Sequence, residues 1–264
     1  MMPVTLVIKD LEAITRALGD LLLEWRVQGL TRGSWEGSQL KADVDRRAHD
    51  FLVKELRCSW PKIPVVSEED ASTQNARRPD EYWLIDPIDG TASFCNGFNG
   101  FVTQVALMRG FQPVLAVVHA PVLGLTFTAT KDGPALRNNA KISIGKSEDR
   151  APVLVDNYPE PRGIALNMYN ALGCHRYVES GSIGLKICCV AEGTADLFIK
   201  DVGVRDWDLA PADLILARAG GVLTTLDGDS LSYKGGFERK GLIAAANRTL
   251  LMQVLKHNKN TRYP

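Results

Sequence analysis

Two carboxylates, a glycine and a hydroxyl stand close together in the sequence Asp-Pro-Ile-Asp-Gly-Thr at residues 86–91. The preceding apolar run, Tyr82 to Ile85, predicts a short buried strand. Pro87 fixes its own φ and biases Asp86 toward an extended conformation, so we expect the strand to end there and the chain to turn. Asp86 and Asp89 then converge on one point. Carboxylates arranged in this way are typical ligands of a hard cation such as Mg²⁺.

The residues that follow the turn suit a phosphate group. Gly90 lets a ligand approach the backbone closely, and a helix that begins at Thr91 directs N–H groups toward an anion. The alternative is an ordinary Asp-Gly turn with Thr91 as a helix cap, since these residues are common in turns. Acidic residues elsewhere in the chain favour the ligand-binding interpretation.

Those other acidic residues stand at the ends of predicted elements. Asp45 begins a predicted helix at 45–57, and Asp208 precedes one at 208–219, so each is either an N-cap or a functional carboxylate. Glu68 and Glu69 follow a predicted strand at 63–66, either in a solvated loop or beside a cation. We expect His49, in the first of these helices, to be solvated.

The elements around these residues predict a layered protein with one domain, 1–264, and two subdomains at about 1–140 and 141–264 with a cleft between them. An amphipathic helix covers 5–27, and the glycine-rich stretch 29–37 is expected to be a connector. Strands at 101–108, 114–120 and 125–130 predict an antiparallel meander. The second half alternates helices and strands; the helices are expected at 161–171, 182–192, 208–219 and 247–257, and the strands at 153–155, 195–199, 222–226 and 242–246.

The composition excludes several classes of protein. Thirty-one basic and thirty-one acidic residues give no net charge, so nothing indicates a nucleic acid polymer or a membrane as a partner. No apolar run is long enough to span a membrane and no signal peptide is evident, so cytoplasmic localisation is the default expectation. Five cysteines without a Cys-x-x-Cys pattern argue against a disulfide framework or a thiolate zinc site.

Taken together, these motifs resemble the inositol monophosphatase superfamily of Mg²⁺-dependent, lithium-sensitive phosphatases. The resemblance covers nearly the whole chain, and it is carried by Asp45, by Ser-Glu-Glu at 67–69, by the run from Trp83 to Phe94, and by Trp-Asp at 207–208. It implies an α+β fold, a layered α-β-α-β-α sandwich with the metal site between the subdomains. A small phosphorylated substrate is implied as the partner, and a homodimer is one assembly that the resemblance allows.

The resemblance also implies a role for each motif residue. Glu68, Asp86 and the carbonyl of Ile88 would bind one Mg²⁺. A second ion would be held by Asp86, Asp89 and Asp208, with Glu68 helping a weaker third. The N–H groups of Gly90 and Thr91 would hold the phosphate, and the Thr91 hydroxyl, hydrogen-bonded to Asp45, would orient and help deprotonate the attacking water. Asp201 stands where relatives carry an acidic residue that contacts substrate hydroxyls.

The sequence departs from the family pattern before the catalytic aspartate. The approach Gln-Leu-Lys-Ala-Asp-Val-Asp at 39–45 leaves Asp43 as a rival to Asp45. We choose Asp45 because it precedes Glu68 by 23 residues, as in the family, and because the predicted helix begins there. Ala92 also replaces a lysine that many bisphosphate nucleotidases carry.

The substrate is less clearly specified. The run at 181–186, which contains Gly181, Ser182 and Lys186, is more similar to the 3′(2′),5′-bisphosphate nucleotidases than to inositol monophosphatases, so these residues are expected to bind substrate. The run at 114–121 is also more similar to the 3′(2′),5′-bisphosphate nucleotidases. Adenosine 3′,5′-bisphosphate, hydrolysed to AMP, is therefore the preferred substrate. Inositol 1-phosphate or another sugar phosphate is the alternative, and Asp201 favours it.

Two rivals belong to other classes. The spacing of Asp86, Asp89 and Thr91 is similar to the Asp-x-Asp-x-Thr nucleophile of haloacid-dehalogenase phosphatases, but the extra residue and the late position argue against it. The other rival is a non-catalytic protein that binds metal or phosphate. The presence of both Asp45 and Thr91, which binding alone does not need, favours an enzyme.

Overall fold

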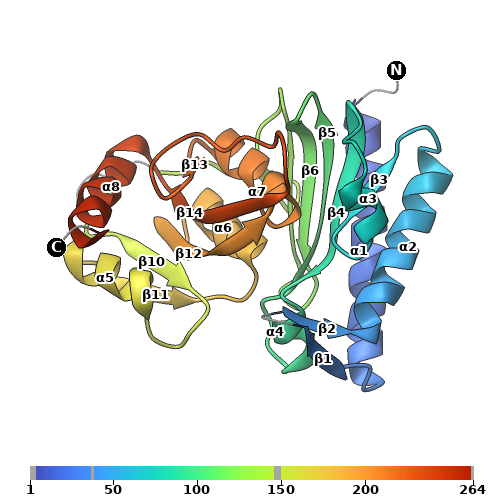
Figure 1. Cartoon of the computed structure of the whole chain (residues 1–264), viewed down its shortest axis with the longest axis horizontal. Coiled ribbons are helices and arrows are strands. Elements are labelled where there is room, and N and C mark those ends of the chain that lie inside the picture. The colour runs from blue at the N-terminus through green and yellow to red at the C-terminus, as the bar shows by residue number, and fades with distance from the viewer. Residues whose placement is uncertain (1–3, 37–38, 146–149, 263–264) are drawn as a thin grey trace.

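The computed structural model describes residues 4–36, 39–145 and 150–262 and shows five layers (Figure 1). Helices α1 (Val4–Val27) and α2 (Asp43–Ser59) form the first layer, against a large sheet. Helices α6 (Ile183–Glu192) and α7 (Asp206–Ala219) lie between that sheet and a second one. Helices α5 (Gly163–Ala171) and α8 (Arg248–Arg262) cover the far side. The predicted α-β-α-β-α architecture is confirmed.

The first sheet contains seven of the strands in the described residues, in the order in which they occur along the chain. β3 and β4 are parallel, and every later neighbour is antiparallel, which confirms the predicted meander. The strands are β3 (Val65–Ser67), β4 (Glu81–Asp89), β5 (Val102–Arg109), β6 (Gln112–Ala120), β7 (Leu125–Thr130), β8 (Leu136–Arg137) and β9 (Ala140–Lys141).

The second sheet, with five strands in the described part of the chain, has the order β11-β10-β12-β14-β13. β10 pairs in parallel with β11 and β12, whereas β14 is antiparallel to both of its neighbours. The strands are β10 (Val153–Asp156), β11 (Arg176–Glu179), β12 (Leu197–Arg205), β13 (Val222–Thr224) and β14 (Glu238–Ala245). The short helices α3 (Ala71–Asn75) and α4 (Thr91–Cys95) belong to the first half.

Buried apolar side chains of the described residues form three clusters, one under each layer of helices, and the middle cluster packs α6 and α7 against both sheets. Leu11, Leu18 and Leu22 of α1 are fully buried against the first sheet, as their helical spacing predicts. Burial of each such leucine stabilises the fold by about 1.5–3 kcal/mol. The middle cluster packs α7 against β5, β6 and β7, so the helix that carries Asp208 rests directly on the sheet that carries Asp86.

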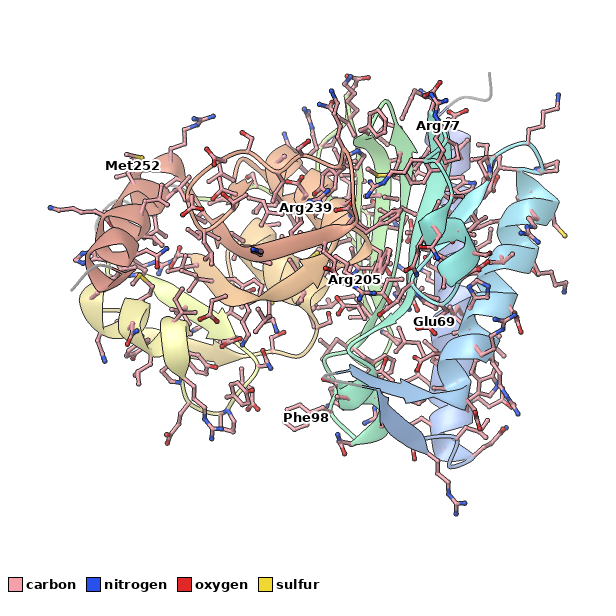
Figure 2. All side chains as sticks on the ribbon, viewed as in Figure 1. Glu69, Arg77, Phe98, Arg205, Arg239 and Met252 are labelled. Carbon is pink, nitrogen blue, oxygen red and sulfur yellow. The ribbon has the colours of Figure 1, made fainter. Side chains whose placement is uncertain are left out.

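The two halves meet along the middle layer. Arg205 and Arg239, both from the second half, lie at this boundary beside the first sheet (Figure 2). None of the described helices combines the length and apolar character that crossing a membrane requires. The predicted division into subdomains at about 140/141 falls within β9, the last strand of the first sheet, and it stays a prediction.

Four local predictions were wrong. The stretch expected to be a connector contributes β1 (Gly33–Glu36), which pairs with β2 (Gln39–Ala42); Gly37 lies outside the described residues. Strands of four residues are too short for a clear alternation. β11 was missed for the same reason. Helix α2 begins at Asp43 rather than Asp45, because two acidic residues suit the positive end of a helix dipole.

The fourth correction concerns the central strand. β4 continues through Pro87 to Asp89 instead of ending at Asp86. Its pairing with β5 shifts register between Asp86 and Asp89, so the proline stands at an irregularity where its missing N–H breaks no regular ladder. The bend that the proline predicts is therefore present, but within the strand.

Candidate active site

The end of β4 and the turn after it form the centre of the site. Asp86 and Asp89 are both buried, and the N–H of Ile88 donates to Oδ1 of Asp86 at 3.1 Å. Gly90 then adopts a left-handed conformation, with φ of 93°, and serves as the N-cap of α4. A side chain is strained in that conformation, which explains the glycine.

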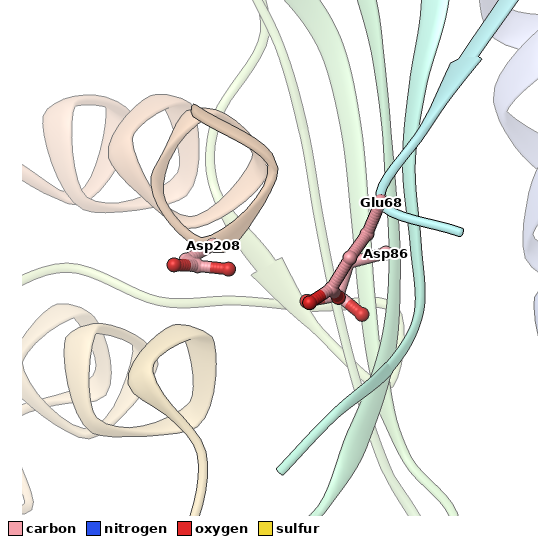
Figure 3. A group of neighbouring side chains, drawn as sticks. All are labelled: Glu68, Asp86 and Asp208. Carbon is pink, nitrogen blue, oxygen red and sulfur yellow. The ribbon is translucent and has the colours of Figure 1, made fainter. Parts of the chain in front are cut away.

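Three carboxylates from three elements converge beside this turn (Figure 3). One oxygen from each of Glu68, Asp86 and Asp208 lies within 4.8 Å of the others. Glu68 follows β3, and its N–H donates to the carbonyl of Ile85 on β4 at 3.3 Å, so these two ligands share one edge. Asp208 faces them from the first turn of α7.

Asp208 is fixed by its position in α7. The helix begins two residues earlier than predicted, at Asp206, so Asp208 is not the N-cap. Its Oδ2 accepts a hydrogen bond from the N–H of Arg205, the true N-cap, at 2.7 Å. This capping interaction orients the carboxylate toward Glu68 and Asp86.

Asp89 is held differently from these three. Its carboxylate accepts hydrogen bonds from the N–H of Gly184 at 2.7 Å and of Ile183 at 3.3 Å, at the start of α6. The side-chain amide of Gln104 donates to the same carboxylate at 3.1 Å. Asp89 thus links the turn after β4 to the start of α6, while it still lines the cleft.

Burial and like charges disfavour the ionised form of each carboxylate in the cluster. Burial, and then the like charge of Glu69, raise the pKa of Glu68 from 4.5 to about 7. Burial first, and the charge of Glu68 next, hold the pKa values of Asp86 and Asp208 well above their usual range. Such carboxylates stay together only when protons or a cation neutralise them. Because every donor is a carboxylate oxygen, the set fits Mg²⁺ and does not resemble a zinc site.

Thr91 and Asp45 lie next to the turn. The Thr91 hydroxyl donates to Oδ1 of Asp45 at 3.1 Å and also lies 3.2 Å from the carbonyl oxygen of Ile88. Asp45 is 3% exposed. Its rival Asp43, on the first residue of α2, is exposed. The structure therefore brings Asp45, and not Asp43, to the threonine.

The predicted residues at 181–186 line the opposite wall of a cleft of about 590 Å³ that also contains the carboxylates. Ser182 caps α6 through a 3.0 Å hydrogen bond from the N–H of Leu185. Gly181 packs so tightly on Gly100 that a Cβ would lie 2.4 Å from the carbonyl oxygen of Gly100, which requires a glycine there. Lys186 is 2% exposed, and its ammonium donates to Asn157 Oδ1 at 2.9 Å and to the carbonyl of Gly181 at 2.7 Å.

Three further residues that line the cleft were missed by sequence reasoning: Asn157, Tyr158 and Lys200. Lys200 donates to both carboxylate oxygens of Asp156 at 3.1 Å. Asp201, the predicted specificity residue, is exposed and is not among the residues that line the cleft. Successive side chains of a strand point to opposite faces. Lys200 lies on the face of β12 that meets the cleft, so its neighbour Asp201 lies on the other face. The sequence feature that could have identified Lys200 as a cleft residue is its position directly after the apolar run at 197–199.

His49 is buried, at 6% exposed, rather than solvated as predicted. Its Nδ1 lies 2.8 Å from the hydroxyl oxygen of Ser67, which in turn accepts a hydrogen bond from the N–H of Glu69 at 3.2 Å. Burial, and then the charge of Arg46, lower the pKa of His49, which favours the neutral ring. The histidine thus supports the loop that carries Glu68.

Comparison with known proteins agrees with this geometry. The 3′(2′),5′-bisphosphate nucleotidase CysQ of Buchnera aphidicola subsp. Acyrthosiphon pisum is 31% identical over 213 residues, which cover 77% of this chain and 79% of the relative. The Nus factor SuhB of Pasteurella multocida is 29% identical over 78% of each chain. An IMPase from Thermotoga maritima has the same fold, with a TM-score of 0.81 at 24% identity over 97% of this chain and 96% of that one.

The family model of the inositol monophosphatases matches residues 5–262, which is nearly the whole chain. This match replaces the haloacid-dehalogenase alternative, and it accounts for the spacing of the carboxylates in the sequence. The chain therefore belongs to the inositol monophosphatase family and is a phosphomonoesterase.

Proposed function

We propose that this protein is a Mg²⁺-dependent phosphatase that hydrolyses adenosine 3′,5′-bisphosphate to AMP and phosphate. The observation that carries the proposal is the convergence of Glu68, Asp86 and Asp208 beside the hydrogen-bonded pair of Thr91 and Asp45. A cation site next to a hydroxyl and carboxylate pair is what hydrolysis by water needs, whereas binding alone needs only the cation site.

Two Mg²⁺ ions are proposed, with a third bound more weakly. Glu68, Asp86 and the carbonyl of Ile88 would hold one, while Asp86, Asp89 and Asp208 would hold the other. When bound, the ions make water more acidic and neutralise the phosphoryl oxygens. Asp89 would have to exchange part of its hydrogen bonding with α6 to serve as a ligand.

The protein groups would divide the rest of the reaction. Thr91, oriented by Asp45, would position a water molecule in line with the ester bond. As the oxygen–phosphorus bond forms, the Thr91 hydroxyl would accept the proton of the water and pass its own proton to the carboxylate of Asp45. The bond between phosphorus and the nucleoside oxygen would break, and that oxygen would take a proton from a solvent water molecule. The N–H groups of Gly90 and Thr91 would hold the phosphoryl group. No covalent intermediate is required.

The bisphosphate is preferred because cationic side chains line the same cleft as the acidic cluster. Lys186 and Lys200 both reach the cleft, and Asn157 accepts from both of them, at 2.9 Å and 3.4 Å. A substrate with a second phosphate would exchange these contacts for charge-assisted ones. The CysQ relative, a 3′(2′),5′-bisphosphate nucleotidase by name, supports the same substrate class.

Inositol 1-phosphate or another sugar phosphate remains the second candidate, since the matching family model is that of the inositol monophosphatases. The position of Asp201 outside the cleft lining weakens the residue-level argument for it. A non-catalytic metal or phosphate binder is the candidate from another class. Binding alone does not require the hydrogen bond between Thr91 and Asp45, so this candidate does not explain it.

The test is phosphate release by the purified protein with Mg²⁺, comparing adenosine 3′,5′-bisphosphate with inositol 1-phosphate, each with and without Li⁺. The proposal predicts a clear preference for the nucleotide in kcat/KM. A preference for the inositol ester would move the assignment to the second candidate. Release from neither, in a protein that still binds Mg²⁺, would favour the non-catalytic binder.

A further inference from the structure

A buried ion cluster lies at the start of α7, two residues before Asp208. Asp206 is fully buried, and two arginines converge on its carboxylate. Nη1 of Arg78 lies 2.6 Å from Oδ2 of Asp206, and Nη2 of Arg239 lies 2.9 Å from Oδ1. The arginine side chains are only 6% and 14% exposed. We call these three residues the Asp206 clamp.

The arginine from the first half of the chain is held on several sides. Arg78 donates to the carbonyl oxygens of Tyr233 and, at 3.0 Å, of Gly236. Its guanidinium lies 3.7 Å from the ring centroid of Phe237, and this phenylalanine packs on Trp207 with centroids 5.3 Å apart. A planar guanidinium that makes several hydrogen bonds and stacks on a ring fixes the geometry of its partners.

The clamp joins the elements that supply the metal ligands. Arg78 stands between Glu68 and β4, so the same segment of chain carries Glu68, Arg78 and then Asp86. Asp206 begins the helix that carries Asp208. Arg239 comes from β14, at the boundary between the halves (Figure 2).

The carboxylates themselves oppose this arrangement. Glu68, Asp86 and Asp208 lie close together, so when all three are ionised and no cation is bound they repel one another across the junction of α7 and β4. Buried ion pairs add little net stability, because desolvation offsets the attraction, but they define geometry strongly. An attraction between opposite charges beside a repulsive site therefore has a positional role.

We propose that Arg78 and Arg239, through Asp206, are positioning residues that hold Asp208 within reach of Glu68 and Asp86 before the cation binds. The inference rests on the metal site of the proposed function. The clamp substitutes for the cation in holding the two halves of the site together, so it raises the affinity of the site for Mg²⁺ without touching the ion.

A matched control exists elsewhere in the chain. Arg150 makes two hydrogen bonds to Asp196, at 2.7 Å and 3.0 Å, and Asp196 is also buried, at 4% exposed. This pair joins the entry of β10 to the segment before β12, and neither residue lines the cleft of the active site. Arg150 is 44% exposed, so this pair is less buried than the clamp, but its loss likewise leaves a buried carboxylate without its arginine, at a place away from α7.

The experiment is calorimetric titration of the metal-free full chain with Mg²⁺, together with thermal unfolding with and without saturating Mg²⁺. Asp206→Asn and Arg78→Met are compared with Asp196→Asn and Arg150→Met. The clamp variants are expected to weaken Mg²⁺ binding tenfold or more and to need correspondingly more Mg²⁺ for half-maximal activity. The control variants lower Tm but keep the wild-type Kd.

Arg78→Lys keeps the charge and the fold while losing the planar fork, so it is expected to bind Mg²⁺ with an intermediate Kd even where Arg78→Met does not fold. Wild-type Kd in the folded clamp variants, with a fall in Tm equal to that of the controls, would overturn the inference and leave the clamp a structural ion pair. Absence of Mg²⁺ binding by the wild type would overturn the proposed metal site itself.

Discussion

The hydroxyl of Thr91 donates a hydrogen bond to Oδ1 of Asp45 at 3.1 Å, across 46 residues of sequence. Asp45 is buried in α2, and Thr91 is the first residue of α4, directly after the turn at the end of β4. This relationship connects the first layer of helices with the end of β4. It is the basis of the proposed mechanism.

Loss of either partner is expected to abolish most of the turnover while Mg²⁺ still binds. Thr91→Ala or Asp45→Asn removes the group that orients and deprotonates water, so kcat falls by about 10²–10⁴-fold, the range of general acid–base catalysis. The carboxylate cluster is untouched. Steady-state kinetics and calorimetric titration with Mg²⁺ measure the two effects separately.

Asp43→Asn is the matched control for that pair, because Asp43 is exposed on the first turn of the same helix. Its kcat stays near the wild-type value. If Asp43→Asn lost activity and Asp45→Asn did not, the choice between the two aspartates would have to be reversed.

Glu68→Gln is expected to weaken Mg²⁺ binding and to stabilise the metal-free protein. At pH 8 the Glu68 carboxylate is charged in a desolvated position beside Glu69; burial first, and the charge of Glu69 next, raise its pKa. The amide removes this penalty, so the free energy of unfolding of the metal-free protein rises by roughly 1–3 kcal/mol. Chemical denaturation of the wild type and the variant, with and without Mg²⁺, measures this difference in the free energy of unfolding. A less stable metal-free variant would show that the carboxylate is satisfied without a cation.

Mg²⁺ binding should strengthen as the pH rises from 6 to 8. The folded-state pKa of Glu68, about 7, lies above its ordinary 4.5, so the metal-free protein holds a proton that Mg²⁺ must displace below pH 7. Displacement of the Glu68 proton alone therefore increases the affinity by up to about tenfold per pH unit below that pKa, and the raised pKa values of Asp86 and Asp208 act in the same direction. Titrations in buffers of different ionisation enthalpy count the released protons. A Kd that is constant over this range would contradict the shift.

The same shift has a consequence for stability. A carboxylic acid whose pKa is raised on folding stabilises the folded state at low pH and loses that contribution as the pH rises through the folded-state value. Metal-free protein should therefore lose stability between about pH 4.5 and 7 from Glu68, and added Mg²⁺ should restore it. Thermal unfolding at pH 5 and pH 8 measures this difference.

The lysines of the cleft should separate the two candidate substrates. Lys186→Met or Lys200→Met is expected to raise KM for adenosine 3′,5′-bisphosphate by about 10–100-fold, because a charge-assisted hydrogen bond contributes about 1.5–3 kcal/mol. Inositol 1-phosphate has no second phosphate, so its KM changes less. Lys240→Met, at an exposed position on β14, is the control. Equal losses for both substrates would remove the argument for a second phosphate.

Hydrophobic periodicity and turn residues predicted most of the helices and strands of this fold, whereas the order of its layers came from the family resemblance. The helical spacing of Leu11, Leu18 and Leu22 and the alternating strands of the meander are local patterns that tertiary packing reinforces. The hairpin of β1 and β2 was not predictable in this way. Its strands are stabilised by pairing between segments too short to show a period.

The carboxylates of the site were predictable because their types and spacing are distinctive, and the resemblance assigned their roles. The residues on the wall of the cleft opposite the carboxylates were harder to predict. The choice between Lys200 and Asp201 depends on which face of β12 meets the cleft, and β12 has an irregularity between Lys200 and Gly203 that no local pattern reveals. His49 was misjudged because its burial depends on the packing of α2 against the loop that carries Glu68.

The central claim is that the carboxylate cluster makes this chain a Mg²⁺-dependent phosphatase. The most direct measurement is the rate of phosphate release from adenosine 3′,5′-bisphosphate as Mg²⁺ is titrated into metal-free wild-type protein and into Asp208→Asn. We expect saturable activation of the wild type and a large loss of activation in the variant. Equal rates for the two proteins, or a wild-type rate that is independent of Mg²⁺, would contradict the account.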